Sequence, residues 1–233
     1  MKADGGFLLD VARDKAADLV KRLSLYKLRA NVEIRDASSE LVVFAMWGGN
    51  PTSNTRPDVT DPRLAELGIR FIALADAVKD HEAASNGESV PPADYHAHRI
   101  SLGVPEGGKD YAFGDAFPHE ALFDQLHGVS FEKGCYVGQE VVSRMEHRGT
   151  ARKRVVPVVA EAPLPAMGTE ITAGDQLIGT LGSSAGNRGL ALLRLDRAAE
   201  MQTKGADLMA GPVKVNIELP PWAKFARATA DHP

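Results

Sequence analysis

The 233-residue sequence contains one cysteine, Cys135, so it can form no internal disulfide and no metal site built from several cysteines. It also lacks long apolar runs, since stretches such as 41–47 and 190–195 are far shorter than the roughly 20 residues of a membrane-spanning helix. The first residues contain no apolar signal core. We therefore predict a cytoplasmic protein that does not enter a membrane.

An excess of positive charge is absent as well, because the formal net charge is −4 at pH 7. This charge argues against a general nucleic-acid-binding protein, whose affinity depends on several phosphate contacts. One stretch differs: residues 132–154 hold six cations and three anions, so they carry +3 while the rest of the chain carries −7. We expect no direct nucleic-acid binding, and we expect any anionic ligand to bind near residues 132–154.

The first part of the chain shows the periodicities of short strands and a helix. Residues 6–11 resemble a strand, and the apolar residues between 16 and 23 have helical spacing. Residues 32–35 alternate in polarity and are followed by the apolar run 41–45, which predicts a hairpin. The order β-α-β-β is typical of half of a ferredoxin-like sandwich. Further along, residues 69–75 read as a buried strand and a helix should begin near Asp94.

The last third of the chain consists of short β-like segments separated by Gly, Pro and Asp. Regular short strands with turn signals favour a small barrel or sandwich. The predicted fold class is therefore α+β, with ferredoxin-like sub-domains followed by a small C-terminal β-barrel. The predicted domains are residues 1–152, a barrel at 153–222 and a tail at 223–233. The expected strands are 155–159, 170–172, 177–181, 189–195 and 213–217.

The single cysteine lies in an unusual context, because Gly134 and Gly138 flank it closely. Glycine allows backbone angles and close approaches that a side chain prevents, so Cys135 should lie on a tight, accessible turn. The neighbouring cation Lys133 would stabilise a thiolate there. The alternative is that Cys135 is a small buried core residue and that the glycines only form a turn.

The string Lys-Gly-Cys-Tyr-Val-Gly-Gln-Glu at 133–140, continuing through Arg144 to Arg148-Gly149, resembles the signature of the YgfZ family. This family is part of the glycine-cleavage T-protein superfamily and includes mitochondrial iron-sulfur assembly relatives. Other segments resemble it too, among them Gly103-Val-Pro-Glu-Gly and Phe117-Pro-His-Glu. The similarity extends over nearly the whole chain.

The resemblance implies a T-protein-like folate-binding fold, tetrahydrofolate or a one-carbon derivative as cofactor, and iron-sulfur client proteins as partners, including tRNA-modifying enzymes. It leaves open whether the protein is itself an enzyme of the one-carbon transferase type. By resemblance, Cys135 and Lys133 are the candidate catalytic residues. The candidate cofactor-binding residues are Tyr136, Gln139, Glu140, Arg144, Arg148 and Arg99. Arg144 and Arg148 would pair with the glutamate carboxylates of folate, since a guanidinium matches a carboxylate bidentately; a solvated charged surface is the alternative for these two.

Two departures from the family pattern affect the folate pocket. Family members carry a further sub-domain before the Gly-Phe-Leu strand, and T-protein relatives usually have an acidic residue where this chain has Ser101. A carboxylate pairs bidentately with the donor edge of a pterin, so a serine would bind it more weakly.

Two alternative functions remain open at this stage. One is an aminomethyltransferase of the T-protein type, and the other is a non-catalytic module that docks iron-sulfur proteins. A metal site is not predicted, because His96 and His98 have no third ligand nearby in the sequence and residues at i and i+2 diverge on a helix.

Overall fold

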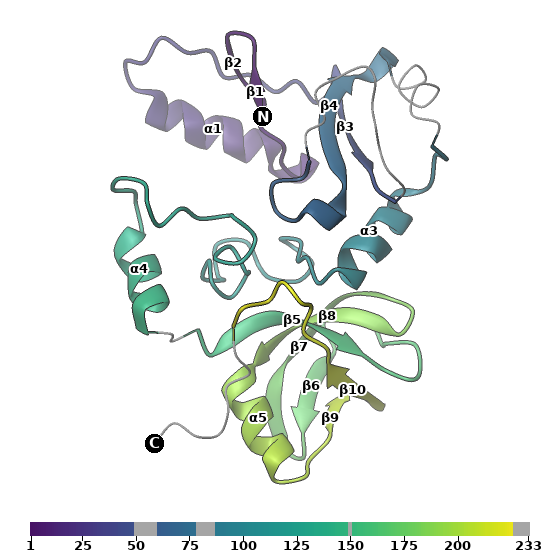
Figure 1. The fold of residues 1–233 in the computed structure, drawn as a ribbon. Helices are drawn as coiled ribbons and strands as arrows, with labels where there is room; N and C mark the ends of the chain where they lie inside the picture. The colour runs from purple at the N-terminus through teal and green to yellow at the C-terminus, as the bar shows by residue number, and fades with distance from the viewer. Residues whose placement is uncertain (49–59, 78–86, 149–150, 226–233) are drawn as a thin grey trace. The chain divides into compact units, whose positions relative to one another are not determined.

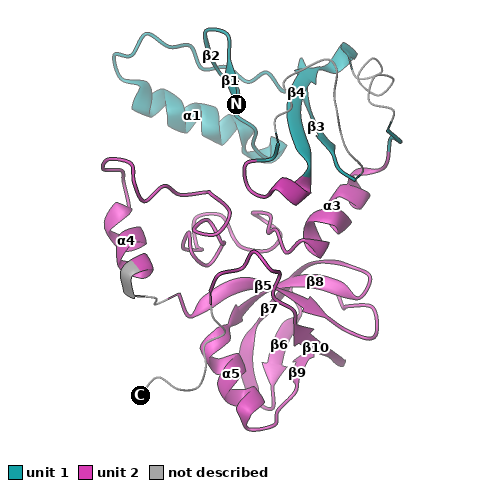
Figure 2. Ribbon diagram, in the orientation of Figure 1, with its two compact units in different colours: residues 1–61, 68–89 teal, residues 62–67, 90–233 magenta. Residues whose placement is uncertain are grey.

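The computed structural model describes residues 1–48, 60–77, 87–148 and 151–225, without the side chains of His147 and Arg148 (Figure 1). The chain divides into two compact units (Figure 2). Unit 1 comprises Met1–Asp61 and Gly68–Ser89, and unit 2 comprises Pro62–Leu67 and Val90–Pro233. None of the described helices has the length and apolar character needed to cross a membrane.

The described part of unit 1 contains two small antiparallel sheets and one long helix. Its elements are β1 (Lys2–Ala3), β2 (Gly6–Phe7), η1 (Arg13–Lys15), α1 (Ala16–Lys27), β3 (Leu41–Met46), β4 (Ile69–Leu74) and η3 (Ala75–Ala77). Strand β1 pairs with β2, and β3 pairs with β4 over six residues. Phe44 and Phe71 lie opposite each other in the second sheet, and their rings stack with centroids 5.1 Å apart. Such cross-strand aromatic pairs stabilise a two-stranded sheet.

The predicted hairpin between residues 32–35 and 41–45 is wrong. Residues 32–35 form no strand, and the partner of β3 is β4, which lies far away in the sequence. The strand expected at 6–11 is limited to Gly6–Phe7. The helix and the strand at 69–75 are confirmed as α1 and β4. Pairing with β4 prevails because it matches two six-residue apolar strands, whereas the polar alternation of 32–35 offers only two apolar side chains.

Unit 2 is built on a closed six-stranded barrel with the strand order β10-β5-β8-β7-β6-β9. Its strands are β5 (Lys153–Val159), β6 (Glu170–Ala173), β7 (Gln176–Ala185), β8 (Arg188–Arg194), β9 (Leu208–Ala210) and β10 (Val213–Ile217), with helix α5 (Leu195–Thr203) after β8. The remaining elements of unit 2 are η2 (Ala65–Leu67), α3 (Pro92–Ser101) and α4 (Gln139–Arg148). The five predicted strands are present, whereas β9 and α5 were not predicted. The α+β class with a C-terminal barrel is confirmed.

Both faces of β5 and β8 are buried, which explains their nearly continuous apolar sequence. Successive side chains of a strand point to opposite faces. Val156 and Leu193 thus join the core inside the barrel, while Val155 and Leu190 join a second core outside it. Ile100 of α3 and Leu122 belong to that second core. The barrel wall therefore supports the non-barrel part of unit 2.

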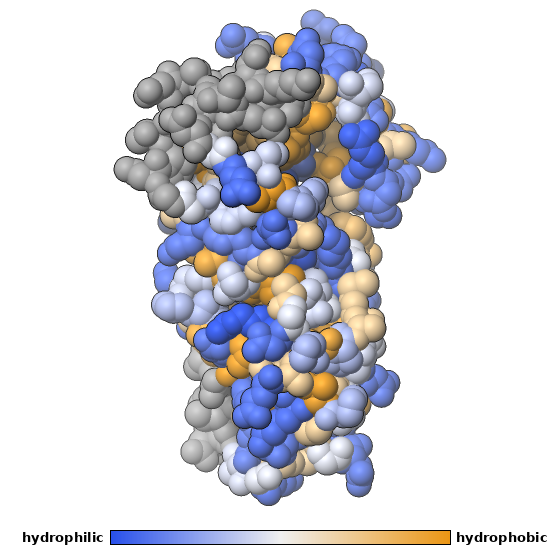
Figure 3. Space-filling model, turned by 90° about the vertical axis from the view of Figure 1, so that its right-hand side faces the viewer, coloured by the Kyte–Doolittle hydropathy of each residue, from blue (hydrophilic) through white to orange (hydrophobic). Residues whose placement is uncertain are grey.

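The surface of the barrel contrasts with this interior. In the view of Figure 3, apolar residues in the lower part of the molecule form small patches among polar side chains.

The barrel strands run from Lys153 to Ile217, while the compact unit that contains them also includes residues 90–152. The predicted division into 1–152, 153–222 and 223–233 stays a prediction, and residues 226–233 lie outside the described part of the chain.

Candidate functional site

Cys135 lies on an exposed loop that leads into helix α4. We call residues 129–138 the Cys135 loop. The loop closes with Gly138, whose φ of 87° is in the left-handed region that favours glycine. The Gln139 N–H donates to the Tyr136 carbonyl at 3.2 Å, and the Val142 N–H donates to the Gly138 carbonyl at 3.2 Å. Cys135 is therefore accessible, as expected, and the buried-cysteine alternative is excluded, but the tight turn spans 136–139 and follows Cys135 instead of containing it.

The structure gathers most of the predicted site residues on this loop and the first turns of α4. The Lys133 ammonium lies 4.5 Å from the centroid of the Tyr136 ring, a cation–π distance. Glu140 and Arg144 form an exposed ion pair of 2.7 Å on α4, next to Gln139. The side chain of Arg148 lies outside the described part of the chain. The residues close to Cys135 in the chain thus supply one ammonium, one phenol ring and a charged helix surface.

Two residues of α4 connect it to the rest of unit 2. Val142 is buried, and the Glu146 carboxylate accepts a 3.0 Å hydrogen bond from Nε2 of the buried His119. Arg154 at the start of the barrel donates from Nη1 to the His119 carbonyl at 2.8 Å and to Asp124 Oδ1 at 2.9 Å. The exposed thiol loop is therefore followed by a helix that is anchored close to the barrel wall.

Arg99, a predicted folate contact, is buried in a different network. Its Nη1 donates to Asp110 Oδ2 at 2.9 Å and to the Val104 carbonyl at 3.0 Å, and its Nη2 donates to Ser183 Oγ at 3.0 Å. Asp110 also accepts from the N–H and hydroxyl of Ser183 on β7. This placement gives Arg99 a structural role, tying α3 to the barrel. The predicted folate contact finds no support in it, because the guanidinium is buried and its bonds go to the protein itself.

The two histidines of the His-Ala-His sequence have separate partners. His96 Nδ1 lies 3.0 Å from Glu106 Oε2, and His98 Nε2 lies 2.9 Å from the Glu66 carbonyl. Burial lowers the pKa of His96 below its usual range, and this outweighs the opposing effect of the Glu106 carboxylate. His96 and His98 are thus held by different partners, Glu106 and the Glu66 carbonyl.

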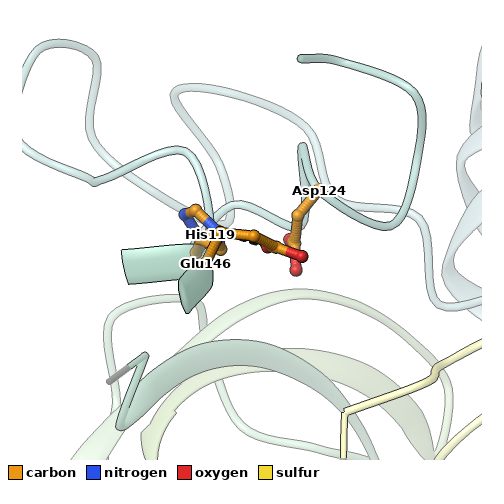
Figure 4. A group of neighbouring side chains, drawn as sticks. All are labelled: His119, Asp124 and Glu146. Atoms are coloured by element: carbon orange, nitrogen blue, oxygen red, sulfur yellow. Dashed lines mark hydrogen bonds and ion pairs between the residues drawn. The ribbon is translucent and has the colours of Figure 1, made fainter. Parts of the chain in front are cut away.

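Sequence reasoning missed a cluster formed by His119, Asp124 and Glu146 (Figure 4). One potential ligand atom from each residue lies within 4.8 Å of the others. The signal in the sequence was weak, since 27 positions separate His119 from Glu146. Only the fold brings α4 next to the segment that contains His119 and Asp124.

Comparisons with known proteins show which proteins this chain is similar to. Residues 152–225 match the family model described as the C-terminal β-barrel domain of CAF17. The chain is 36% identical to the mouse protein named iron-sulfur cluster assembly factor IBA57, mitochondrial, over 93% of its own length and 64% of that protein. The human protein of the same name is 36% identical over 81% of this chain and 56% of its own length. The chain thus spans less than two thirds of these curated relatives.

A solved structure with a similar fold is the glycine cleavage system aminomethyltransferase T from Bartonella henselae. The TM-score is 0.50 at 15% sequence identity, and the match covers 68% of this chain and 47% of that one. This likeness establishes a T-protein-like fold for the matched part, in agreement with the fold that the signature implied.

The comparisons overturn the predicted cytoplasmic location, because the mouse, human and Mycosarcoma maydis relatives are all named as mitochondrial. Their names point to mitochondria instead. The prediction rested on a missing apolar signal core, which argues only against a secretory signal. Mitochondrial targeting segments are amphipathic and rich in arginine, so that criterion does not detect them.

Proposed function

We propose that this protein is an iron-sulfur cluster assembly factor of the IBA57 and YgfZ type, which binds tetrahydrofolate and supports iron-sulfur client enzymes, including tRNA-modifying ones. The observation that carries the proposal is the similarity to IBA57 over 93% of the chain, combined with an exposed Cys135 in the segment that bears the family signature. Because the chain spans 64% of the mouse relative, the activity, clients and cofactor are all part of the proposal.

The geometry of the Cys135 loop suits a thiol that acts on a partner. A cysteine reacts or binds metal as the thiolate and has to be reached from solvent, and Cys135 is exposed. The chain has no second cysteine, so a cluster held through Cys135 would need its other ligands from the client. In this proposal the loop presents the sulfur, while the anchored helix α4 fixes the position of the loop.

Tetrahydrofolate binding would rest on the loop and on α4. Tyr136 offers a ring for stacking on a pterin, and Lys133 and Arg144 offer cations for the glutamate carboxylates. Ser101, which replaces the acidic residue of T-protein relatives, donates its hydroxyl to the His98 carbonyl at 2.7 Å. The pterin edge would therefore need a donor or acceptor other than Ser101.

The thiol role is tested by complementation in cells that lack the endogenous relative, with the activity of an iron-sulfur enzyme as the readout. Wild type should restore the activity, and Cys135→Ala should not, while both proteins accumulate to equal levels. The matched control is Ser130→Ala, another exposed residue of the same loop. Full rescue by Cys135→Ala would refute the thiol role.

The proposed binding of tetrahydrofolate is tested separately, by equilibrium dialysis against tetrahydrofolate. We expect saturable binding that weakens in Lys133→Ala; no saturable binding would remove the cofactor from the proposal and favour the docking module. Formation of methylene-tetrahydrofolate from an aminomethyl-lipoyl carrier would instead favour an aminomethyltransferase.

A further inference from the structure

The segment that follows the last barrel strand packs against the non-barrel part of unit 2 and is drawn in yellow in Figure 1. We call residues 218–225 the C-terminal strap. The Trp222 Nε1–H donates to the Leu102 carbonyl at 2.9 Å, and the Lys224 N–H donates to Gln125 Oε1 at 2.9 Å. The strap is therefore bonded to two segments outside the barrel.

At its end the strap covers Arg154. The Phe225 ring centroid lies 4.7 Å from the guanidinium carbon of Arg154, a cation–π distance. The Arg154 side chain is only 8% exposed, and such contacts are stronger where water is excluded. The same guanidinium donates to the His119 carbonyl at 2.8 Å and to Asp124 Oδ1 at 2.9 Å. Phe225 thus helps to hold the group that fixes the main chain at His119.

His119 contacts the chain on both sides of Cys135. Its ring centroid lies 6.1 Å from that of Phe131, within the range of aromatic pairs. Its Nε2 lies 3.0 Å from Oε2 of Glu146 on α4. Phe131 precedes Cys135 and Glu146 follows it, so one buried imidazole meets both flanks of the thiol segment. The strap and the loop are therefore joined by a continuous series of contacts through Arg154 and His119.

The other contacts of the Cys135 loop described above are local. Lys133 lies over the Tyr136 ring, and the Gln139 N–H donates to the Tyr136 carbonyl. Residues 130–135 are all exposed. A segment of this kind opens at a low cost in free energy, so contacts at its two flanks have a large effect on how often it is ordered.

We propose that Phe225 and His119 are positioning residues for the Cys135 thiol. Phe225 holds Arg154 against the His119 carbonyl, and the His119 ring holds the two flanks of the loop. A loop that is ordered before a partner arrives loses less conformational entropy on binding. The ordering of the loop does not depend on the proposed function, whereas its benefit to the thiol rests on that function.

The ordering is tested by amide hydrogen exchange of the protein alone, without client or folate. In Phe225→Ala the amides of residues 142–146 should exchange about fivefold faster or more, because a contact that favours the ordered loop is lost. The amides of β6 and β7 in the barrel should keep their rates. Phe225→Tyr, which retains the aromatic ring, should exchange like wild type.

Glu146→Ala removes the contact between His119 and α4 directly, so it should also accelerate exchange at residues 142–146. Phe113→Ala is the matched control, because Phe113 is 53% exposed and its ring lies next to Tyr111 instead of Arg154. It should leave the exchange of residues 142–146 unchanged. Unchanged exchange there in Phe225→Ala, or equal acceleration in α4 and in the barrel, would overturn the positioning role.

The effect on the thiol is measured by the complementation assay with an iron-sulfur enzyme as readout. At equal protein levels Phe225→Ala should show a partial loss of rescue, and Phe225→Tyr should regain it. If wild type itself gives no rescue, the proposed function is wrong, and the exchange data still decide whether Phe225 orders the loop. Full rescue by Phe225→Ala together with faster exchange in α4 would refute the benefit to the thiol.

Discussion

The barrel and the Cys135 loop are close neighbours in the sequence and opposites in physical character. The barrel buries apolar residues on two sides of β5 and β8, while nearly every residue between 131 and 140 is exposed. The barrel is specified by packing, whereas the loop is specified by a few backbone and polar interactions. Segments rich in exposed backbone have low local stability, and binding residues commonly occur on such loops above a rigid base.

Helix α4, which lies between the loop and the barrel in the sequence, is connected to the barrel through His119. Arg154 is the second residue of β5 and donates to both the His119 carbonyl and Asp124. His119 in turn bonds Glu146 of α4. The loop therefore begins and ends near anchored positions, although it has no core of its own. The following predictions test whether the barrel and its buried contacts provide most of the stability, while the Cys135 loop provides little.

The largest loss of stability is expected for Asp110→Ala. Asp110 is fully buried and accepts from Arg99, from the Glu106 N–H and from Ser183, so its removal leaves the buried guanidinium with the partly exposed Glu106 as its remaining carboxylate partner. Breaking such a buried pair costs about 3–5 kcal/mol. Urea unfolding measures the change, and Asp207→Ala, which breaks the exposed pair with Lys214, should cost less than about 1 kcal/mol.

Leu193→Ala should lower the free energy of unfolding about as much as Asp110→Ala, or slightly less. Leu193 is fully buried inside the barrel, and truncation of a core leucine costs about 2–5 kcal/mol. Leu177 is 50% exposed, so Leu177→Ala is the matched control and should cost much less. Equal losses for the two variants in urea unfolding would contradict the assignment of the barrel core.

In the Cys135 loop the expected effects are smaller and depend on backbone angles. Gly138→Ala introduces a side chain at a φ of 87° with no neighbouring atom within 4 Å, so the cost is conformational strain of about 1 kcal/mol. Gly134 also has open space but no positive φ. Gly134→Ala should therefore be nearly neutral, and thermal unfolding of the two variants compares them directly.

The smallest expected change in stability depends on pH and concerns Asp196, in the first turn of α5. The hydrogen bond from Arg194 lowers the pKa of Asp196 below its ordinary value. A carboxylate with a lowered pKa in the folded state contributes stability above its unfolded pKa and loses it as the pH falls through the folded one. Asp196→Asn should cost less than about 1 kcal/mol at pH 7, because the pair is about one-third exposed.

Unfolding of wild type and Asp196→Asn between pH 7 and pH 2 measures this difference. The gap between the two proteins should begin to narrow below about pH 4, the ordinary pKa of an aspartate, and should close as the pH falls through the lower pKa of Asp196 in the folded protein. A gap that stays constant over the whole range would show that the ion pair is not its source.

The predictions from sequence succeeded where the signal is local. The strands of the barrel followed from short apolar runs between turn residues, and the exposure of Cys135 and the turn that follows it at Gly138 were expected from the local glycines. They failed where pairing is distant, as for β3, whose partner was expected at 32–35 and is β4. Register and partner choice depend on contacts between residues far apart in the chain, and periodicity in one segment contains no information about them.

The sequence by itself determined the α+β class, the barrel, and a single thiol in a glycine-flanked, positively charged stretch, because these depend on composition and short-range spacing. Only the tertiary structure decided that Arg99 is buried against Asp110, and that His119, Asp124 and Glu146 meet. Burial and the meeting of side chains depend on how the non-barrel segments pack against β5, β7 and β8. That packing is settled by apolar area removed from water across distant parts of the chain.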